Sequence, residues 1–82
     1  MLRFLNDINE APPIDIFINN RKIVSRLEYG DYSAQFDAKP GLYTIEVVAN
    51  NESFLQINFQ LRHKDTTIVL TGNPPEIELR IL

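Results

Sequence analysis

The sequence predicts an all-β fold of antiparallel strands, and three observations lead to this prediction. Apolar and polar residues alternate along most of the chain, which is the period of a strand with one buried face. Turn-forming residues interrupt this alternation at intervals of roughly 8 to 12 residues, as between the short strands of a sandwich or barrel. No stretch has the apolar spacing of an amphipathic helix. A chain of 82 residues holds one core, so we expect a single domain over residues 1–82.

The first half of the chain contains four predicted strands. We expect them over residues 2–6, 14–18, 22–26 and 32–36. In the last of these, Tyr32, Ala34 and Phe36 alternate with polar residues, which indicates a half-buried strand. The second and third strands are joined by Asn19-Asn20, because asparagine tolerates the positive φ angles of a tight hairpin turn.

Four more segments in the second half, residues 42–49, 55–61, 66–71 and 76–82, show the same alternation or are rich in β-branched residues. Phe59 lies in phase with its apolar neighbours and should face the core. Two facing sheets can accommodate such a set, so we expect an immunoglobulin-like antiparallel β-sandwich of seven or eight short strands. The opposite faces of the strands should meet water with Asp15, Glu46, Gln56, Asn58, Glu78 and Arg80.

Four stretches in this order resemble a known family. They are NDINEAPPIDIFIN (residues 6–19), LEYGDYS (27–33), KPGLYTIEV (39–47) and TIVLTG (67–72). Together they are similar to the domain of unknown function 4397, over nearly the whole chain. The resemblance implies a β-sandwich of bacterial and archaeal proteins, often in tandem or attached to secreted and cell-surface chains, with no established enzymatic activity. This chain has Asn19-Asn20 at the usual Asn-Gly hairpin, and Asn6 where members often carry histidine.

Composition excludes several classes of function. The net charge is −3 and the eight Lys and Arg residues are scattered along the chain without a basic stripe, so we expect no nucleic-acid partner. The chain has no cysteine, which removes disulfides and every cysteine-based metal site. No apolar segment is long enough for membrane insertion or for a signal peptide. We therefore expect a cytoplasmic chain unless it is exported by another route or cut from a longer precursor.

Candidate catalytic and metal-binding residues are few. His63 is the only histidine, and it lies in a polar turn without a predicted partner. Asp7, Glu10 and Asp15 are acidic, and Asp7 with Glu10 could offer oxygens to calcium, but the sequence lacks the spacing of a calcium-binding loop. A hydrolase built on acid pairs needs a buried cleft that this small chain can hardly enclose. The prediction is a protein that is not an enzyme and that binds no cofactor.

The strongest functional prediction is an interaction surface. Phe17, Val48, Phe54 and Val69 lie out of phase with the core faces of their strands and would form an exposed apolar patch if they cluster. Bulges or burial on a second face would hide some of them instead. The last strand, residues 76–82, alternates regularly and contains no proline after Pro75, so a free edge there would invite pairing. We expect an interaction or self-assembly module that binds itself or another protein and forms a homo-oligomer.

A ligand loop is the alternative prediction. Tyr29, Asp31 and Tyr32 surround a turn glycine, and exposed tyrosines of this kind could stack on a sugar ring. The module would then bind carbohydrate or another envelope component. The competing interpretation places Tyr32 in the core and Tyr29 over the end of the sandwich.

Overall fold

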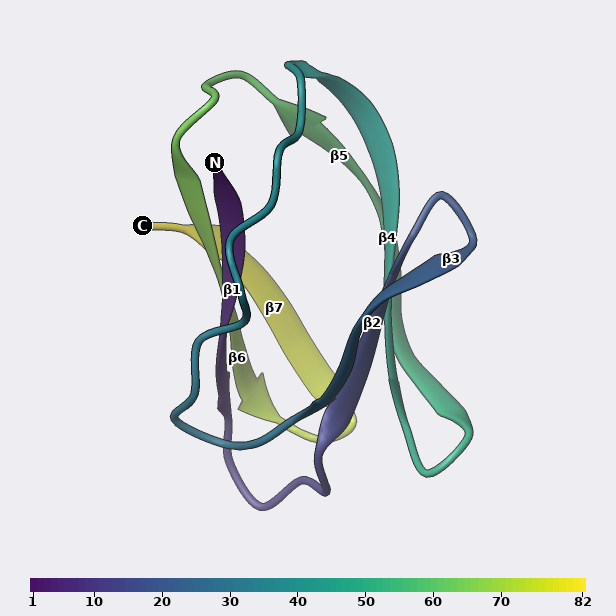
Figure 1. Cartoon of the computed structure of the whole chain (residues 1–82). Helices are drawn as coiled ribbons and strands as arrows, with labels where there is room; N and C mark the ends of the chain where they lie inside the picture. The colour runs from purple at the N-terminus through teal and green to yellow at the C-terminus, as the bar shows by residue number, and fades with distance from the viewer.

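Seven strands and no helix make up the protein, as a computed structural model that describes all residues 1–82 shows (Figure 1). The strands are β1 (Leu2–Ile8), β2 (Ile14–Ile18), β3 (Arg21–Leu27), β4 (Gly41–Ala49), β5 (Glu52–Leu61), β6 (Thr66–Asn73) and β7 (Glu76–Ile81). Since there is no helix, no helical segment is available to cross a membrane.

The strands form two sheets that face each other (Figure 1). One sheet has three strands in the order β1-β6-β7, and the other has four in the order β3-β2-β4-β5. The predicted all-β fold with two sheets is therefore confirmed, and its immunoglobulin-like arrangement stays a prediction. The expectation that all strands pair antiparallel was wrong, because β1 runs parallel to β6. These strands are neighbours in space without being neighbours in sequence, so no hairpin dictates an antiparallel direction.

Two asparagine pairs make the tight turns of the four-stranded sheet. Asn19 and Asn20 have φ angles of 50° and 67° between β2 and β3, as the sequence predicts. Asn50 and Asn51 have φ angles of 51° and 62° between β4 and β5. The Asn19 side chain also accepts a hydrogen bond from the Thr44 N–H at 2.9 Å, which ties the first hairpin to β4.

The core lies between the two sheets and receives alternate residues of the strands. Fourteen apolar residues are buried there: Leu2, Phe4, Ile8, Ile14, Ile16, Ile18, Leu27, Ile45, Val47, Ala49, Leu61, Ile68, Leu70 and Ile77. Phe59, predicted to face the core, is half-buried and packs against this cluster. It lies on β5, an edge strand, so neighbouring strands cover it on only one side.

One buried polar residue, Asn6, links the two sheets. It follows the core alternation of β1 and is only 1% exposed. Its Nδ2 donates to the Leu27 carbonyl at 2.8 Å, and its Oδ1 accepts from the Ile8 N–H at 3.0 Å. Since Leu27 ends β3 in the other sheet, the Asn6 amide holds the two layers together at this end of the sandwich.

The predicted strand over residues 32–36 is absent, and an irregular segment covers the edge of β1 there instead. Two isolated β-bridges, Leu2 with Phe36 and Leu5 with Tyr32, join this segment to β1 in place of a continuous strand. Between them the Ser33 hydroxyl takes the place of a backbone partner and accepts from the Phe4 N–H at 2.9 Å. Because the side chain replaces a carbonyl, the segment departs from strand geometry, and the chain has seven strands rather than eight.

Candidate functional site

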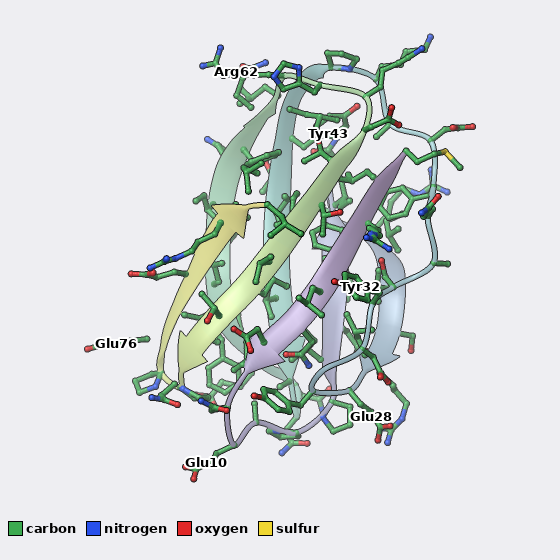
Figure 2. The ribbon with its side chains drawn as sticks, turned by 90° about the vertical axis from the view of Figure 1, so that its left-hand side faces the viewer. Glu10, Glu28, Tyr32, Tyr43, Arg62 and Glu76 are labelled. Carbon is green, nitrogen blue, oxygen red and sulfur yellow. The ribbon has the colours of Figure 1, made fainter.

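The edge strands of the two sheets are where this sandwich has most backbone N–H and C=O groups without a hydrogen-bond partner. The segment over residues 30–36 closes β1, as hydrogen bonds from Leu2, Asn6 and Ser33 to backbone partners across the gap show. The other three edge strands, β3, β5 and β7, each pair with a single neighbour. β5 and β7 lie on the same side of the sandwich, at the left of Figure 2. An edge strand exposes a row of free N–H and C=O groups to a further strand.

The β7 edge is regular and exposed. Its pairing with β6 has no register shift from Glu76 to Ile81. Ile81 is 53% exposed, and Leu82, which follows it, is 77% exposed. The Arg80 guanidinium lies 3.2 Å from the Glu78 carboxylate on the outer face. β7 contains no lysine, proline or bulge, which are the common means of discouraging edge pairing.

One hydrogen bond identifies which residues of β7 have free backbone N–H and C=O groups. The Leu82 N–H donates to the Thr67 carbonyl of β6 at 3.0 Å. Bonding direction alternates along an antiparallel strand, so Arg80, Glu78 and Glu76 also turn their backbone groups toward β6. Ile77 and Leu79, together with Ile81, therefore direct their N–H and C=O groups away from the sheet.

The β3 edge is better protected. Two register shifts interrupt its pairing with β2, and Arg26 has a φ of 53°, so its free edge is not a straight ladder. The Arg26 N–H is also occupied by the Asp15 carboxylate at 2.8 Å. A groove of about 510 Å³ separates β3 from the segment that covers β1, with Ile23 and Phe36 among its lining residues. Bulges of this kind blunt an edge, so β3 is the poorer site for strand addition.

The predicted ligand loop lies where the chain leaves β3. Tyr29 is 56% exposed and Tyr32 is 47% exposed. The interpretation that places Tyr32 in the core is therefore wrong, because the irregular backbone after Gly30 does not keep strand alternation. The Arg3 guanidinium lies 4.1 Å from the centroid of the Tyr32 ring and covers one of its faces. The Asp31 carbonyl accepts from the Asn6 N–H at 3.1 Å, and its carboxylate is exposed without a partner.

The four out-of-phase apolar residues do not form one patch. Phe17 and Val48 lie on the outer face of the four-stranded sheet, where they are diagonal neighbours on β2 and β4. Val69 lies on the outer face of the other sheet. Phe54 packs against the core instead of pointing outward, because a register shift at Val48 makes it the extra residue of a bulge. The sequence pattern assumes a regular strand, and it fails at this bulge.

Phe17 is also partly covered by a charged neighbour. The Lys22 Nζ lies 5.7 Å from the centre of its ring and 3.4 Å from the Asp15 carboxylate. All four predicted residues are half-buried. Phe17 and Val48 alone offer too small an apolar area to define an interface.

Acidic residues and the histidine are dispersed. A polar hollow of about 520 Å³ on the outer face of the three-stranded sheet contains Asp7, Glu76 and Glu78. Asp7 accepts from the Thr71 hydroxyl at 3.0 Å. No three acidic or histidine side chains are placed to hold a metal ion together. His63 is exposed in the turn before β6, where only its backbone carbonyl is bonded, by the Thr66 hydroxyl at 2.8 Å.

The N-terminal amino group makes the one ion pair that joins distant parts of the chain. It lies 2.7 Å from the Asp65 carboxylate and donates to the Lys64 carbonyl at 2.6 Å. The hydrogen bond and charge of this amino group lower the pKa of Asp65. The pair fixes the start of β1 beside the start of β6.

Fold and edges together define a small β-sandwich domain in which one sheet edge is covered and three are open. The family model described as "Domain of unknown function (DUF4397)" matches residues 1–82, and the chain belongs to this family. No curated protein and no solved structure matches the chain.

Proposed function

We propose that this domain is a non-enzymatic interaction module that self-assembles by strand addition at the edge of β7. The observation that carries the proposal is the contrast between the edges of the three-stranded sheet. Ten backbone hydrogen bonds lie outside the strand ladders, and several of these close β1. β7 has no such cover, although its ladder with β6 is regular. Main-chain hydrogen bonds give strand addition its affinity.

The absence of a competing cover on β7 makes a second chain its natural partner. Free N–H and C=O groups at an edge are solvated, so pairing exchanges water for a backbone partner and adds the burial of apolar side chains. Ile81 and Leu82 supply exposed apolar surface beside these groups. Their burial stabilises the associated state at about 25 cal/mol per Å² before the cost of association is deducted.

Light scattering after gel filtration tests the proposal across micromolar to millimolar concentrations. The monomer has a mass of 9.5 kDa, and we expect the measured mass to rise toward twice this value. Ile81→Pro removes an N–H that points away from β6, so the variant should fold and remain monomeric. Leu42→Ser is the matched control, because Leu42 is 65% exposed on β4, and it should associate as the parent does. A parent that stays at 9.5 kDa throughout would refute self-assembly.

A second candidate function is carbohydrate binding by the loop of Tyr29, Asp31 and Tyr32. It is favoured by two tyrosines that are 56% and 47% exposed beside an unpaired carboxylate. Aromatic faces and carboxylates are suited to the apolar faces and hydroxyl groups of sugars. Tyrosine fluorescence titrations with soluble oligosaccharides of glucose and of N-acetylglucosamine test this candidate. Saturable quenching that disappears in Tyr29→Ala would support it, and no response to either series would count against it.

A further inference from the structure

We infer that the partner of β7 is the β7 strand of a second copy, paired antiparallel about a two-fold axis at Leu79, with each Glu78 opposite the other copy's Arg80. This inference rests on the proposed function and adds the partner, the register and the charge pairs. It begins from the backbone groups that face outward on β7. They belong to Ile77, Leu79 and Ile81, because the residues between them bond to β6.

The outward residues restrict the register of a symmetric pair. Only registers that place outward residues opposite one another form hydrogen bonds, and an axis at Glu78, Leu79 or Arg80 joins two or more such pairs, whereas an axis at Ile77 or Ile81 joins only one. An axis at Glu78 places Glu78 opposite Glu78 at its centre, although Glu76 then lies opposite Arg80 on either side, and an axis at Arg80 opposes two arginines. Like charges directly opposite one another destabilise a strand pair. The axis at Leu79 opposes no like charges, opposes Glu78 to Arg80 twice and pairs all three outward residues, so it is the favoured register.

Both faces of the pair are complementary in this register. On the outer face the two Glu78–Arg80 pairs lie at positions that are not hydrogen-bonded, where side chains on adjacent strands come closest. On the inner face Leu79 meets Leu79 of the second copy, and Ile77 meets Ile81. The present Arg80–Glu78 contact within one chain is exposed, so exchanging it for contacts between chains costs little.

The edge of β3 does not offer the same self-complementarity. Its charged residues are Arg21, Lys22 and Arg26, all of one sign, so pairing β3 with β3 brings only like charges together. β7 carries both signs at alternate positions on one face. A charge pattern that is its own complement is what an isologous interface requires.

The two-fold axis also stops growth of the three-stranded sheet after one pairing. Joining the two β7 strands produces one six-stranded sheet across both copies, with β1 of each copy at its ends. The β1 ends are already closed by residues 30–36, so this sheet cannot grow further. β5 lies beside β7 within each copy, on the same side of the sandwich as the paired strands.

Charge reversal tests this register. Residues 78 and 80 lie opposite each other across the β7–β7 pair. Both are basic in Glu78→Arg and both are acidic in Arg80→Glu, so each variant alone opposes like charges. We expect the dissociation constant of each to rise about tenfold or more. An equimolar mixture should form heterodimers with affinity near that of the parent, and so should homodimers of Glu78→Arg/Arg80→Glu. Glu46→Arg on β4 is the matched control for a change in net charge and should dimerise as the parent does.

Cysteine cross-linking provides a measurement that does not depend on affinity. The chain has no cysteine, so Glu78→Cys and Arg80→Cys introduce single thiols. Mixed under mild oxidation, they should form the heterodisulfide, because opposite residues in an antiparallel pair lie within disulfide range. Glu78→Cys mixed with Gln56→Cys, which lies on β5, should not.

The outcomes separate this inference from the proposed function. If the parent dimerises while the reversed variants dimerise equally and the thiols do not cross-link, this register is wrong and self-assembly stands. If the parent is monomeric at every concentration, both are wrong. Restored association in the mixture together with the Glu78→Cys/Arg80→Cys heterodisulfide, with normal circular dichroism for each variant, supports the antiparallel pair at Leu79.

Discussion

Removing the Asn6 side chain should be among the most destabilising single changes in this domain. Asn6→Ala deprives the Ile8 N–H of its acceptor and the Leu27 carbonyl of a donor, at a site that is 1% exposed. Each buried polar group left without a partner costs about 1 to 3 kcal/mol, so we expect a loss of about 2 to 4 kcal/mol. A chain of 82 residues has roughly 4 to 12 kcal/mol in total, so the loss is a large part of its stability.

Asn6→Asp separates the two hydrogen bonds. The carboxylate still accepts from the Ile8 N–H, but it cannot donate to the Leu27 carbonyl unless it is protonated. Burial raises the pKa of a carboxyl group above its unfolded value, so the folded variant binds the proton more tightly. The stability of Asn6→Asp should therefore fall as pH rises from the unfolded pKa through the raised folded pKa. The parent should show no such decline in that range, because its amide does not titrate.

Urea denaturation followed by circular dichroism measures these effects, with the free energy of unfolding as the readout. Asn58→Ala is the matched control, since Asn58 is exposed and bonds only to the Thr44 hydroxyl at 3.1 Å. It should change stability by no more than about 0.5 kcal/mol. An Asn6→Ala variant within about 1 kcal/mol of the parent would refute the argument that this amide joins the sheets.

Three further outcomes are expected. Gly72→Ala should lose at least about 2 kcal/mol in urea denaturation, because its φ is 121° and the new Cβ would overlap the carbonyl oxygen of Glu76; a neutral result would show that the turn before β7 can shift. Phe4→Ala should cost about 3 to 5 kcal/mol and Phe59→Ala clearly less, since Phe4 is fully buried and Phe59 only half so; the reverse order would place Phe59 deeper than described. His63→Ala should leave the unfolding midpoint within about 0.5 kcal/mol of the parent, because its side chain is exposed without a partner; a larger change would reveal an interaction at this turn.

Features determined by neighbouring residues could be predicted from the sequence. The turns at Asn19-Asn20 and Asn50-Asn51 need positive φ angles at adjacent positions, and asparagine signals this locally. β4 is continuous and regular, so its alternation indicates correctly that Ile45 and Val47 face the core. Alternation also predicts β7, whose free edge is the basis of the proposed site.

Features that depend on distant residues could not be predicted in this way. Residues 32–36 alternate like a strand, but the Ser33 hydroxyl and the shape of the β1 edge decide their conformation. Phe54 moves to the inner side because of a bulge that composition does not indicate. One signal was available for Asn6, since it is the only polar side chain in phase with Leu2, Phe4 and Ile8. A polar residue at a core position implies a buried partner, although the sequence alone does not identify that partner.

The parallel pairing of β1 with β6 has a consequence for how the domain folds. Arg3 and Thr67, which are opposite each other in this ladder, are 64 residues apart in sequence. Closing so long a loop costs entropy before any contact between these strands compensates for it, which slows folding toward the millisecond-to-second range of all-β domains. On the ribosome the four-stranded sheet can pair once residue 61 has emerged. Until β6 follows, the apolar face of β1 has no partner strand in its own sheet.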